Sequence, residues 1–242
     1  RISVTSAGAQ VGGGTSDDPQ PNGDGSLVVF HSRANNLASG DAEDGFEIYL
    51  RNVTGNTTTV MPGGNGAGNH PMISNDGNYI SYASTSANIV SGDSNGQSDV
   101  FLINRNTLAA TRLSVTAANS TDARCLTAAQ GGSDPYSLCS TVVGGRSVET
   151  TLDGTGNNIA FISLANNLVA GDTNGHRDIF LRDRRTGITR LVSIGRRGRP
   201  ADDDSLYPAI SANGRYVSFS SLARNLVTGD TNGQADIFLY DR

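Results

Sequence analysis

The chain repeats one short polar loop four times, and the side chains of this loop are of the types that bind a hard cation. The loops span residues 40–47, 92–99, 171–178 and 229–236, and three of them read Gly-Asp-x-Asn-Gly-x-x-Asp. Carboxylate and amide oxygens at alternating positions of a tight glycine turn are the ligands that Ca²⁺ prefers. The candidate ligands are Asp41, Glu43, Glu47, Asp93, Asn95, Asp99, Asp172, Asn174, Asp178, Asp230, Asn232 and Asp236.

The same loops also have a purely structural interpretation. Asp and Asn side chains stabilise turns by bonding to their own backbone, and Asn-Gly is a favoured hairpin turn whether or not an ion binds. One loop supplies about three side-chain oxygens, whereas Ca²⁺ takes about six to eight ligands. Acidic residues between the repeats, at 17–18 and 202–204, would have to supply further ligands. Both interpretations, a calcium loop and a duplicated hairpin, therefore stay open.

Patterns typical of enzymes are weak. The three histidines are His31, His70 and His176, and none lies beside a Gly-x-Ser-x-Gly or a His-Glu-x-x-His arrangement. His176 stands where two other loops carry glutamine, at 97 and 234, which favours a surface histidine without an essential role. Acids recur at repeated positions, which favours structure over one asymmetric active site. A glycosidase-like carboxylate pair remains an alternative.

Composition limits the partners and the compartment. The net charge of −5 argues against nucleic-acid binding, and no apolar run is long enough to span a bilayer. Cys125 and Cys139 lie in a small-residue stretch, and we expect them to form a disulfide. A disulfide predicts an oxidising, extracytoplasmic environment. The alternative is two free thiols.

The elements that position the loops are short strands. Asn-Gly or Asp-Gly turns separate β-rich runs, most clearly at 207–211, 216–220 and 237–240. With a period of about fifty residues and four strands per repeat, the chain is predicted to be all-β, a four-bladed β-propeller of four-stranded antiparallel blades. We expect a single domain, 1–242, with blades at about 17–62, 69–116, 146–194 and 205–242 plus 1–6, and an insertion at about 118–145.

The N-terminal segment matches the end of a repeat. Residues 1–5 read Arg-Ile-Ser-Val-Thr, and residues 112–116 read Arg-Leu-Ser-Val-Thr. We therefore expect residues 1–6 to supply the fourth strand of the last blade, pairing with 237–240 and closing the ring. The alternatives are a section of a longer array and strand exchange between neighbouring chains.

The repeat resembles the bacterial PD40/TolB-like family of WD40-type propellers. The signs are Pro-x-Ile-Ser-x-Asn/Asp-Gly before a β run, followed by Asp-Ile-Phe-Leu and Asp-Arg, over nearly the whole chain outside the insertion. The resemblance implies the fold, and such propellers act as scaffolds, receptors or enzymes. The loops also resemble the last seven positions of calcium hairpins in integrin-type propellers. Ser91, Ala170 and Thr228 stand where those hairpins carry a further acid.

These observations predict a non-catalytic, extracytoplasmic propeller that acts as a binding or assembly module, with Ca²⁺ as the expected cofactor. The expected partner is a protein or a glycan on a propeller face, self-association included. Neither nucleic acid nor a membrane span is expected. Two alternatives are kept: a structural subunit of a cell-surface or extracellular polymer, and an extracellular hydrolase or lyase that acts on glycans or peptides.

Overall fold

The computed structural model describes residues 1–10, 12–40, 45–63, 69–94, 97–116 and 150–242. The two cysteines and the predicted insertion lie outside these residues, so the disulfide stays a prediction. Fifteen strands and one 3₁₀ turn, η2 (Arg196–Gly198), make up the regular structure of the described part. Within that part, no helix is long and apolar enough to cross a membrane.

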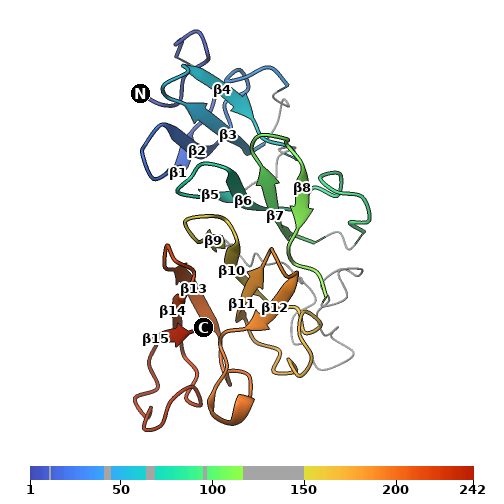
Figure 1. Ribbon diagram of the computed structural model, residues 1–242, viewed down its shortest axis with the longest axis vertical. Coiled ribbons are helices and arrows are strands. Elements are labelled where there is room, and N and C mark those ends of the chain that lie inside the picture. Colours follow the sequence, from blue (N-terminus) through green and yellow to red (C-terminus); the bar gives the residue numbers. More distant parts are fainter. Residues whose placement is uncertain (11, 41–44, 64–68, 95–96, 117–149) are drawn as a thin grey trace.

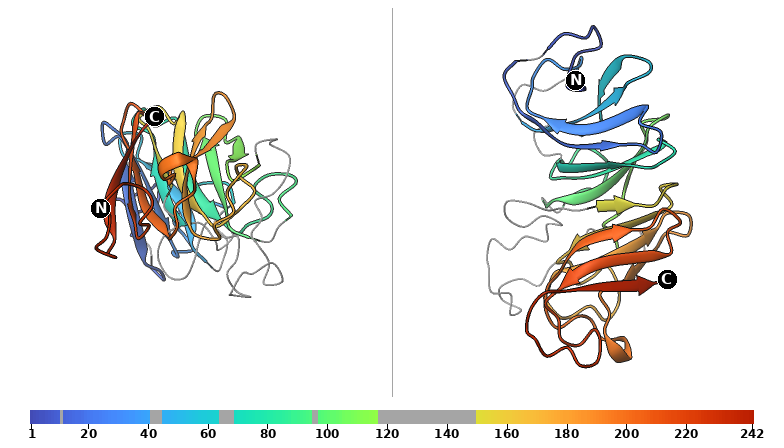
Figure 2. Two further views of the ribbon diagram at one scale, coloured as in Figure 1. Left: turned by 90° about the horizontal axis from the view of Figure 1, so that it is seen from below. Right: turned by 90° about the vertical axis from the view of Figure 1, so that its left-hand side faces the viewer.

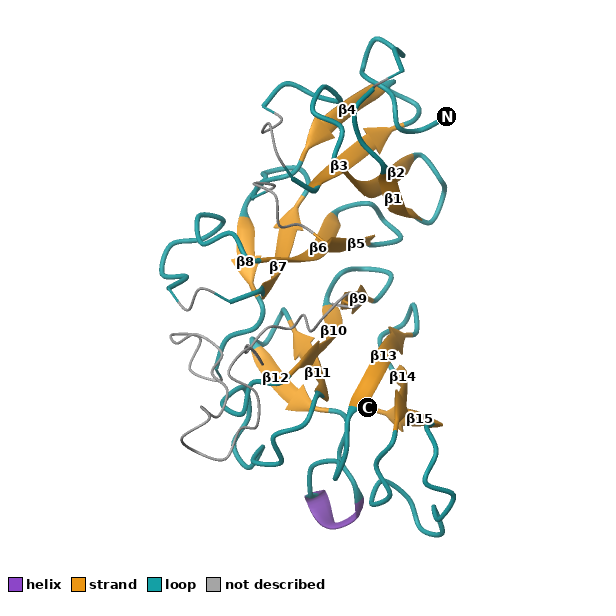
Figure 3. Cartoon of the chain, turned by 180° about the vertical axis from the view of Figure 1, so that it is seen from behind, coloured by secondary structure: helices purple, strands orange, loops and turns teal. Residues whose placement is uncertain are grey.

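The strands form four separate antiparallel sheets, which confirms the all-β class. Figure 3 shows the strands of these sheets as orange arrows, grouped sheet by sheet. We name the sheets blades 1 to 4 in chain order. Blade 1 holds β1 (Ser16–Pro21), β2 (Leu27–Ser32), β3 (Glu47–Asn52) and β4 (Thr57–Val60); blade 2 holds β5 (Asn69–Ile73), β6 (Tyr79–Ser84), β7 (Asp99–Asn104) and β8 (Ala110–Arg112); blade 3 holds β9 (Thr150–Leu152), β10 (Asn158–Ser163), β11 (Asp178–Asp183) and β12 (Ile188–Leu191); blade 4 holds β13 (Ser205–Ile210), β14 (Tyr216–Ser221) and β15 (Asp236–Asp241).

Tight polar turns connect the first and second strands of the blades, as predicted. In blade 4, Asn213 Oδ1 accepts a hydrogen bond from the backbone N–H of Arg215, and Gly214 adopts a φ of 69°. In blade 2, Asp76 Oδ1 accepts the N–H of Asn78 in the same way. Asx side chains and a left-handed glycine therefore determine where each strand reverses.

Apolar layers between consecutive blades form the core. Side chains alternate along a strand, so the third strand of a blade sends residues toward both neighbouring blades. In β11, Phe180 packs in the layer between blades 2 and 3, while Ile179 and Leu181 pack in the layer between blades 3 and 4. Figure 2 shows the blades stacked along the long axis of the molecule. The repeated packing of sheet on sheet is what positions the polar loops.

The predicted closure of the ring is wrong. Blade 4 has three strands with β15 at its edge, and the N-terminal segment lies on blade 1 instead. There Thr58 Oγ1 donates to the carbonyl of Val4 at 2.6 Å, and the N–H of Thr58 donates to Ser6 Oγ at 2.9 Å. Blades 1 and 4 lie at opposite ends of an open array (Figure 1). Local hydrogen bonds to the adjacent blade therefore determine the position of residues 1–6.

Candidate functional site

The four repeated loops each connect the second and third strands of a blade. Their last acidic residue opens the third strand, and the structure places it as Glu47 in β3, Asp99 in β7, Asp178 in β11 and Asp236 in β15. The first three of these side chains are buried, and Asp236 is half-buried. Three predicted ligands, Asp41, Glu43 and Asn95, lie outside the described residues.

The blade 3 loop buries two carboxylates. Asp172 is 4% exposed and Asp178 is fully buried. Asn174 Nδ2 donates to Asp178 Oδ2 at 2.6 Å and to the carbonyl of Ala201 at 2.9 Å, while Ser193 Oγ donates to Asp178 Oδ1 at 2.5 Å. The loop is therefore tied both to its own blade and to the connection that leads to blade 4.

These two carboxyl groups resist ionisation. Burial raises the pKa of Asp172 to about 6, against the opposing effect of a backbone hydrogen bond from Asn174. Burial also raises the pKa of Asp178 to about 7, where the hydrogen bond from Ser193 opposes the shift and the charge of Asp172 adds to it. A cation beside the pair would favour the ionised forms of both groups.

In blade 2 a guanidinium group of the protein itself is such a cation. Arg112 Nη1 lies 3.2 Å from Asp93 Oδ1 and 3.7 Å from Asp99 Oδ2. Arg112 pairs with Phe101 across the β7–β8 ladder, and the matching partner of Phe180 in blade 3 is Leu191. Among the described residues, no arginine forms an ion pair with Asp172 or Asp178. An arginine therefore lies beside the carboxylate pair in blade 2, whereas in the described part of blade 3 no arginine does, and the charge of His176 is the smallest of the influences on the pKa of Asp178.

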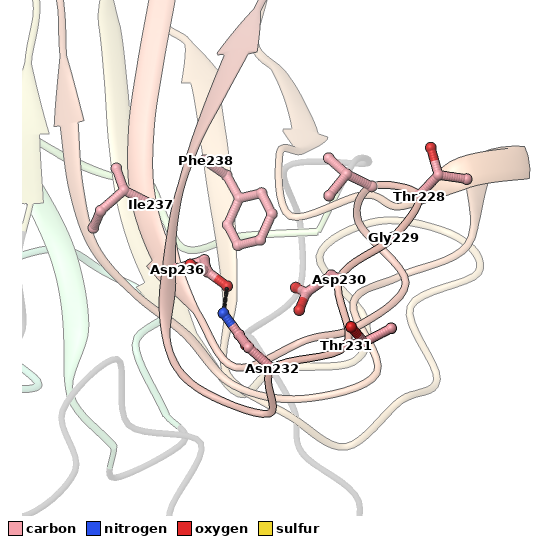
Figure 4. Close-up of a pocket in the computed structure, with 9 residues that line it drawn as sticks. Thr228, Gly229, Asp230, Thr231, Asn232, Asp236, Ile237 and Phe238 are labelled. Carbon is pink, nitrogen blue, oxygen red and sulfur yellow. Dashed lines mark hydrogen bonds between the residues drawn. The ribbon is translucent and has the colours of Figure 1, made fainter.

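The blade 4 loop is more open. Asn232 Nδ2 donates to Asp236 Oδ2 at 2.9 Å, as Figure 4 shows. Asp230 Oδ1 is buried and has no hydrogen-bond partner in the described part of the chain. These side chains line a cavity of about 360 Å³ together with Ile237 and Phe238. The blade 4 loop therefore presents an unsatisfied acceptor at an open cavity.

The blade 1 loop differs from the other three. Glu47 replaces the aspartate, and Tyr49 Oη donates to Glu47 Oε2 at 2.7 Å. A phenol therefore donates a hydrogen bond to this carboxylate.

A second polar site, which the sequence did not reveal, lies along the first strands of the blades. His70 Nδ1 is 2.7 Å from Asp18 Oδ2. Both residues precede a proline and both have a positive φ, 49° for Asp18 and 46° for His70, where the ladder register shifts. Bulges of this kind redirect side chains beside functional sites. The pair opens into a cavity of about 300 Å³ lined by Asp18, Gln20, His70, Pro71, Met72, Thr150, Thr151, Pro208 and Ala209, which come from all four blades.

His31 belongs to the same polar cluster. Its Nδ1 lies 3.8 Å from Asp18 Oδ2 and its ring centroid lies 6.3 Å from that of His70. Burial lowers the pKa of His31, and the carboxylates of Asp18 and Asp17 partly oppose that shift. These residues are far apart in sequence and belong to three strands. The X-Pro dipeptide at the start of the repeats is the signal that would have pointed to them.

The acids at 202–204 do contact the blade 3 loop, although not its carboxylate pair. Potential ligand atoms of His176, Asp203 and Asp204 lie within 4.8 Å of one another. Arg177 Nη1 lies 3.0 Å from Asp204 Oδ2, so an arginine already compensates part of this charge. The expectation that these acids complete the ligand set of Asp172 therefore remains a proposal.

Solved structures similar to this chain are β-propellers. No protein family and no curated protein matches the sequence. The β-propeller domain of the Trilobed protease from Pyrococcus furiosus matches 95% of this chain and 55% of its own length, with 10% identity and a TM-score of 0.51. An oligogalacturonate lyase in complex with manganese matches 94% of this chain and 51% of its own length, with 12% identity and a TM-score of 0.52.

A third structure, the putative TolB from Agrobacterium tumefaciens, has 14% identity and a TM-score of 0.47 over 94% of this chain and 58% of that one. The chain thus spans about half the length of these three structures. At identities this low, the structural likeness shows the class of fold, a β-propeller, and leaves the activity open. Membership of the PD40/TolB-like family stays a prediction.

Proposed function

We propose that this chain is a non-catalytic propeller module that binds a partner outside the cytoplasm, and that its blade 3 loop holds Ca²⁺. The observation that carries the calcium site is the buried pair of Asp172 and Asp178. Blade 2 balances the equivalent pair with Arg112, whereas blade 3 has Leu191 at that position. A divalent cation with oxygen ligands would replace the missing guanidinium.

The binding role is supported by apolar surface on blade 4. Ile237 is 78% exposed and Leu239 is 68% exposed, and Tyr207 of the same blade is 56% exposed. Exposed apolar patches of this kind mark interaction surfaces. The extracytoplasmic location is supported by the predicted disulfide between Cys125 and Cys139.

Thermal unfolding with CaCl₂ and with a chelator tests the calcium site. A ligand that binds only the folded state stabilises it by about 2.7 kcal/mol at one hundred times its Kd. For a chain of this size we expect the Tm to rise by about 5–10 °C. Asp172→Asn should abolish the rise, and Asp24→Asn, which alters an exposed turn carboxylate, should retain it. An unchanged Tm of the wild-type protein in calcium would refute the site.

The second candidate function is a hydrolase or lyase at the cavity along the first strands. The contact of His70 Nδ1 with Asp18 Oδ2 favours it, because a positioned histidine and a carboxylate are suited to general acid–base chemistry. Assays with oligogalacturonate and peptide substrates, compared between wild type and His70→Asn, distinguish the two functions. Turnover that is lost in the variant would support an enzyme and would contradict the non-catalytic role.

A further inference from the structure

Three polar side chains that lie far apart in the sequence converge where blades 1 and 2 meet. Asp18 belongs to β1, His31 to β2 and His70 to β5. Asp18 Oδ2 lies 2.7 Å from His70 Nδ1 and 3.8 Å from His31 Nδ1, so one carboxylate oxygen faces an imidazole nitrogen of each histidine. Two imidazoles and a carboxylate around one point are ligands that proteins use for divalent transition metals.

The Nδ1 atom of His31 is buried and has no hydrogen-bond partner in the described part of the chain. His31 is 7% exposed, and the ring of Phe46 packs beside its own with the two centroids 4.6 Å apart. Buried polar atoms are nearly always satisfied, so an exception calls for an explanation. A cation that binds on the side of Asp18 would satisfy this nitrogen.

The distances around Asp18 suit zinc. Zn²⁺ binds imidazole nitrogen and carboxylate oxygen at about 2.0–2.2 Å, so two ligand atoms of a tetrahedral site lie about 3.3 Å apart. The separations of 2.7 Å and 3.8 Å from Asp18 Oδ2 lie on either side of that value. The ring centroids of His31 and His70 are 6.3 Å apart, so the ion has to draw the two rings together. His70 is the ring with room to move, because its side chain is 32% exposed and that of His31 is 10% exposed.

Strained backbone directs Asp18 and His70 to this point. Both residues have a left-handed φ, 49° and 46°, and both precede a proline, a position that favours extended backbone. Strain of this kind gathers at functional sites. Tyr207 of blade 4 has a φ of 56° before Pro208, so the bulge itself belongs to the repeated blade. The residue in the bulge differs from blade to blade, and an aspartate and a histidine in neighbouring bulges are particular to this site.

A further carboxylate lies at the other nitrogen of the His31 ring. Asp17 Oδ2 is 3.9 Å from His31 Nε2. In metal sites, a carboxylate at the second ring nitrogen holds the imidazole in the orientation that the ion needs. Asp18 and His70 also line the cavity of about 300 Å³, and no arginine is among the described residues that line it. The three candidate ligands therefore lie beside a space that can admit water or a small molecule.

We propose that His31 Nδ1, His70 Nδ1 and Asp18 Oδ2 bind one Zn²⁺ ion whose fourth position is open to this cavity. Mixed nitrogen and oxygen ligands favour a transition metal, whereas Ca²⁺ takes oxygen ligands. Three protein ligands and one open position are the arrangement of zinc sites that present a water molecule or a substrate to the ion. The site goes beyond the calcium site proposed for blade 3 and shares no residue with it.

Isothermal titration calorimetry of the full chain with ZnCl₂ tests the site. Excess CaCl₂ is present throughout, so that calcium sites are already filled and do not contribute. We expect the wild type to bind one ion per chain. His70→Asn and Asp18→Asn should each abolish this binding, and both variants should fold, because asparagine tolerates left-handed backbone. Asp17→Asn should weaken the binding by about 10–100-fold.

NMR spectra of the imidazole rings show which histidines bind the ion. The chain has three histidines, so all three rings can be followed together. Zinc should shift the signals of His31 and His70 and leave those of His176 unchanged. The matched control His176→Gln, which alters the histidine of the blade 3 loop, should bind zinc as tightly as the wild type.

Two outcomes would overturn the proposal. One is a wild-type chain that binds no zinc, and the other is zinc binding that leaves the signals of His31 and His70 in place. Neither outcome bears on the calcium response of Asp172 and Asp178, which is measured by thermal unfolding without zinc.

Discussion

Leu181 and Leu239 occupy the same position in the third strands of blades 3 and 4, yet their environments are opposite. Leu181 pairs with Ala160 and is 1% exposed, while Leu239 pairs with Ser218 and is 68% exposed. The local sequence around them is nearly identical, Asp-Ile-Phe-Leu in both strands. Only the presence of a neighbouring blade on that face separates the two residues.

The two leucines therefore make a matched pair for mutation. Leu181→Ala should lower the free energy of unfolding by about 2–5 kcal/mol, because it removes buried methyl groups and leaves a cavity. Leu239→Ala should change it by no more than about 0.5 kcal/mol in dilute protein. Urea denaturation measures both. Equal losses would contradict the packing described for these faces.

Substitutions at the equivalent positions Leu191 and Arg112 should change how the stability of blades 3 and 2 depends on a cation. Leu191→Arg places a guanidinium beside Asp172 and Asp178, so the metal-free protein should gain stability and lose its response to Ca²⁺. Arg112→Leu leaves the carboxylates of Asp93 and Asp99 without their ion pair, and breaking a buried pair costs about 3–5 kcal/mol. Tm values in calcium and in chelator measure both effects.

The control for this exchange is Arg190→Leu, which removes an exposed charge from the same strand as Leu191. It should leave the calcium response unchanged. If Leu191→Arg kept the full calcium response, the ion would have to bind elsewhere than at the Asp172–Asp178 pair.

The raised pKa values of Asp172 and Asp178 predict a particular pH dependence. The two groups have pKa values of about 6 and about 7 in the folded chain, against about 3.9 for aspartate in an unfolded one. The folded state therefore holds protons that the unfolded state has released. This contribution to stability is complete below about pH 4 and is lost as the pH rises to about 7.

Urea midpoints at pH 5 and pH 8, in chelator, test this dependence by comparing wild type with Asp178→Asn. The wild type should lose more stability between the two pH values, because asparagine does not ionise. Calcium should restore the wild type at pH 8 far more than at pH 5, where the carboxyl groups are largely protonated. Equal changes of the urea midpoint in the wild type and in Asp178→Asn would contradict a raised pKa of Asp178.

His31 should titrate below the usual range of a histidine. Burial lowers its pKa, and the negative charge of Asp18 partly opposes that shift. Asp18→Asn should therefore lower the midpoint further, as followed by the NMR shifts of the imidazole ring. A midpoint of His31 above 6.5 in the wild type would show that the ring is less buried than the structure places it.

The periodic sequence by itself determined the strands, the hairpin turns and the recurrence of the polar loops. These features depend on interactions within a few residues, such as the Asx turn at Asn213 and the alternation of Ile179, Phe180 and Leu181. The propeller class follows from the same repetition, since each sheet needs a neighbour on both faces to bury its apolar side chains.

Tertiary structure alone decided which copies of the loop differ in chemistry. The contrast of Arg112 with Leu191 depends on cross-strand register, and the pairing of Asp18 with His70 depends on two blades meeting at their first strands. The fate of residues 1–6 was decided in the same way. Their sequence matches a fourth strand, yet hydrogen bonds to Thr58 hold them on blade 1, far from β15. Sequence similarity specifies what a segment can pair with, and the geometry of the whole array determines which partner lies within reach.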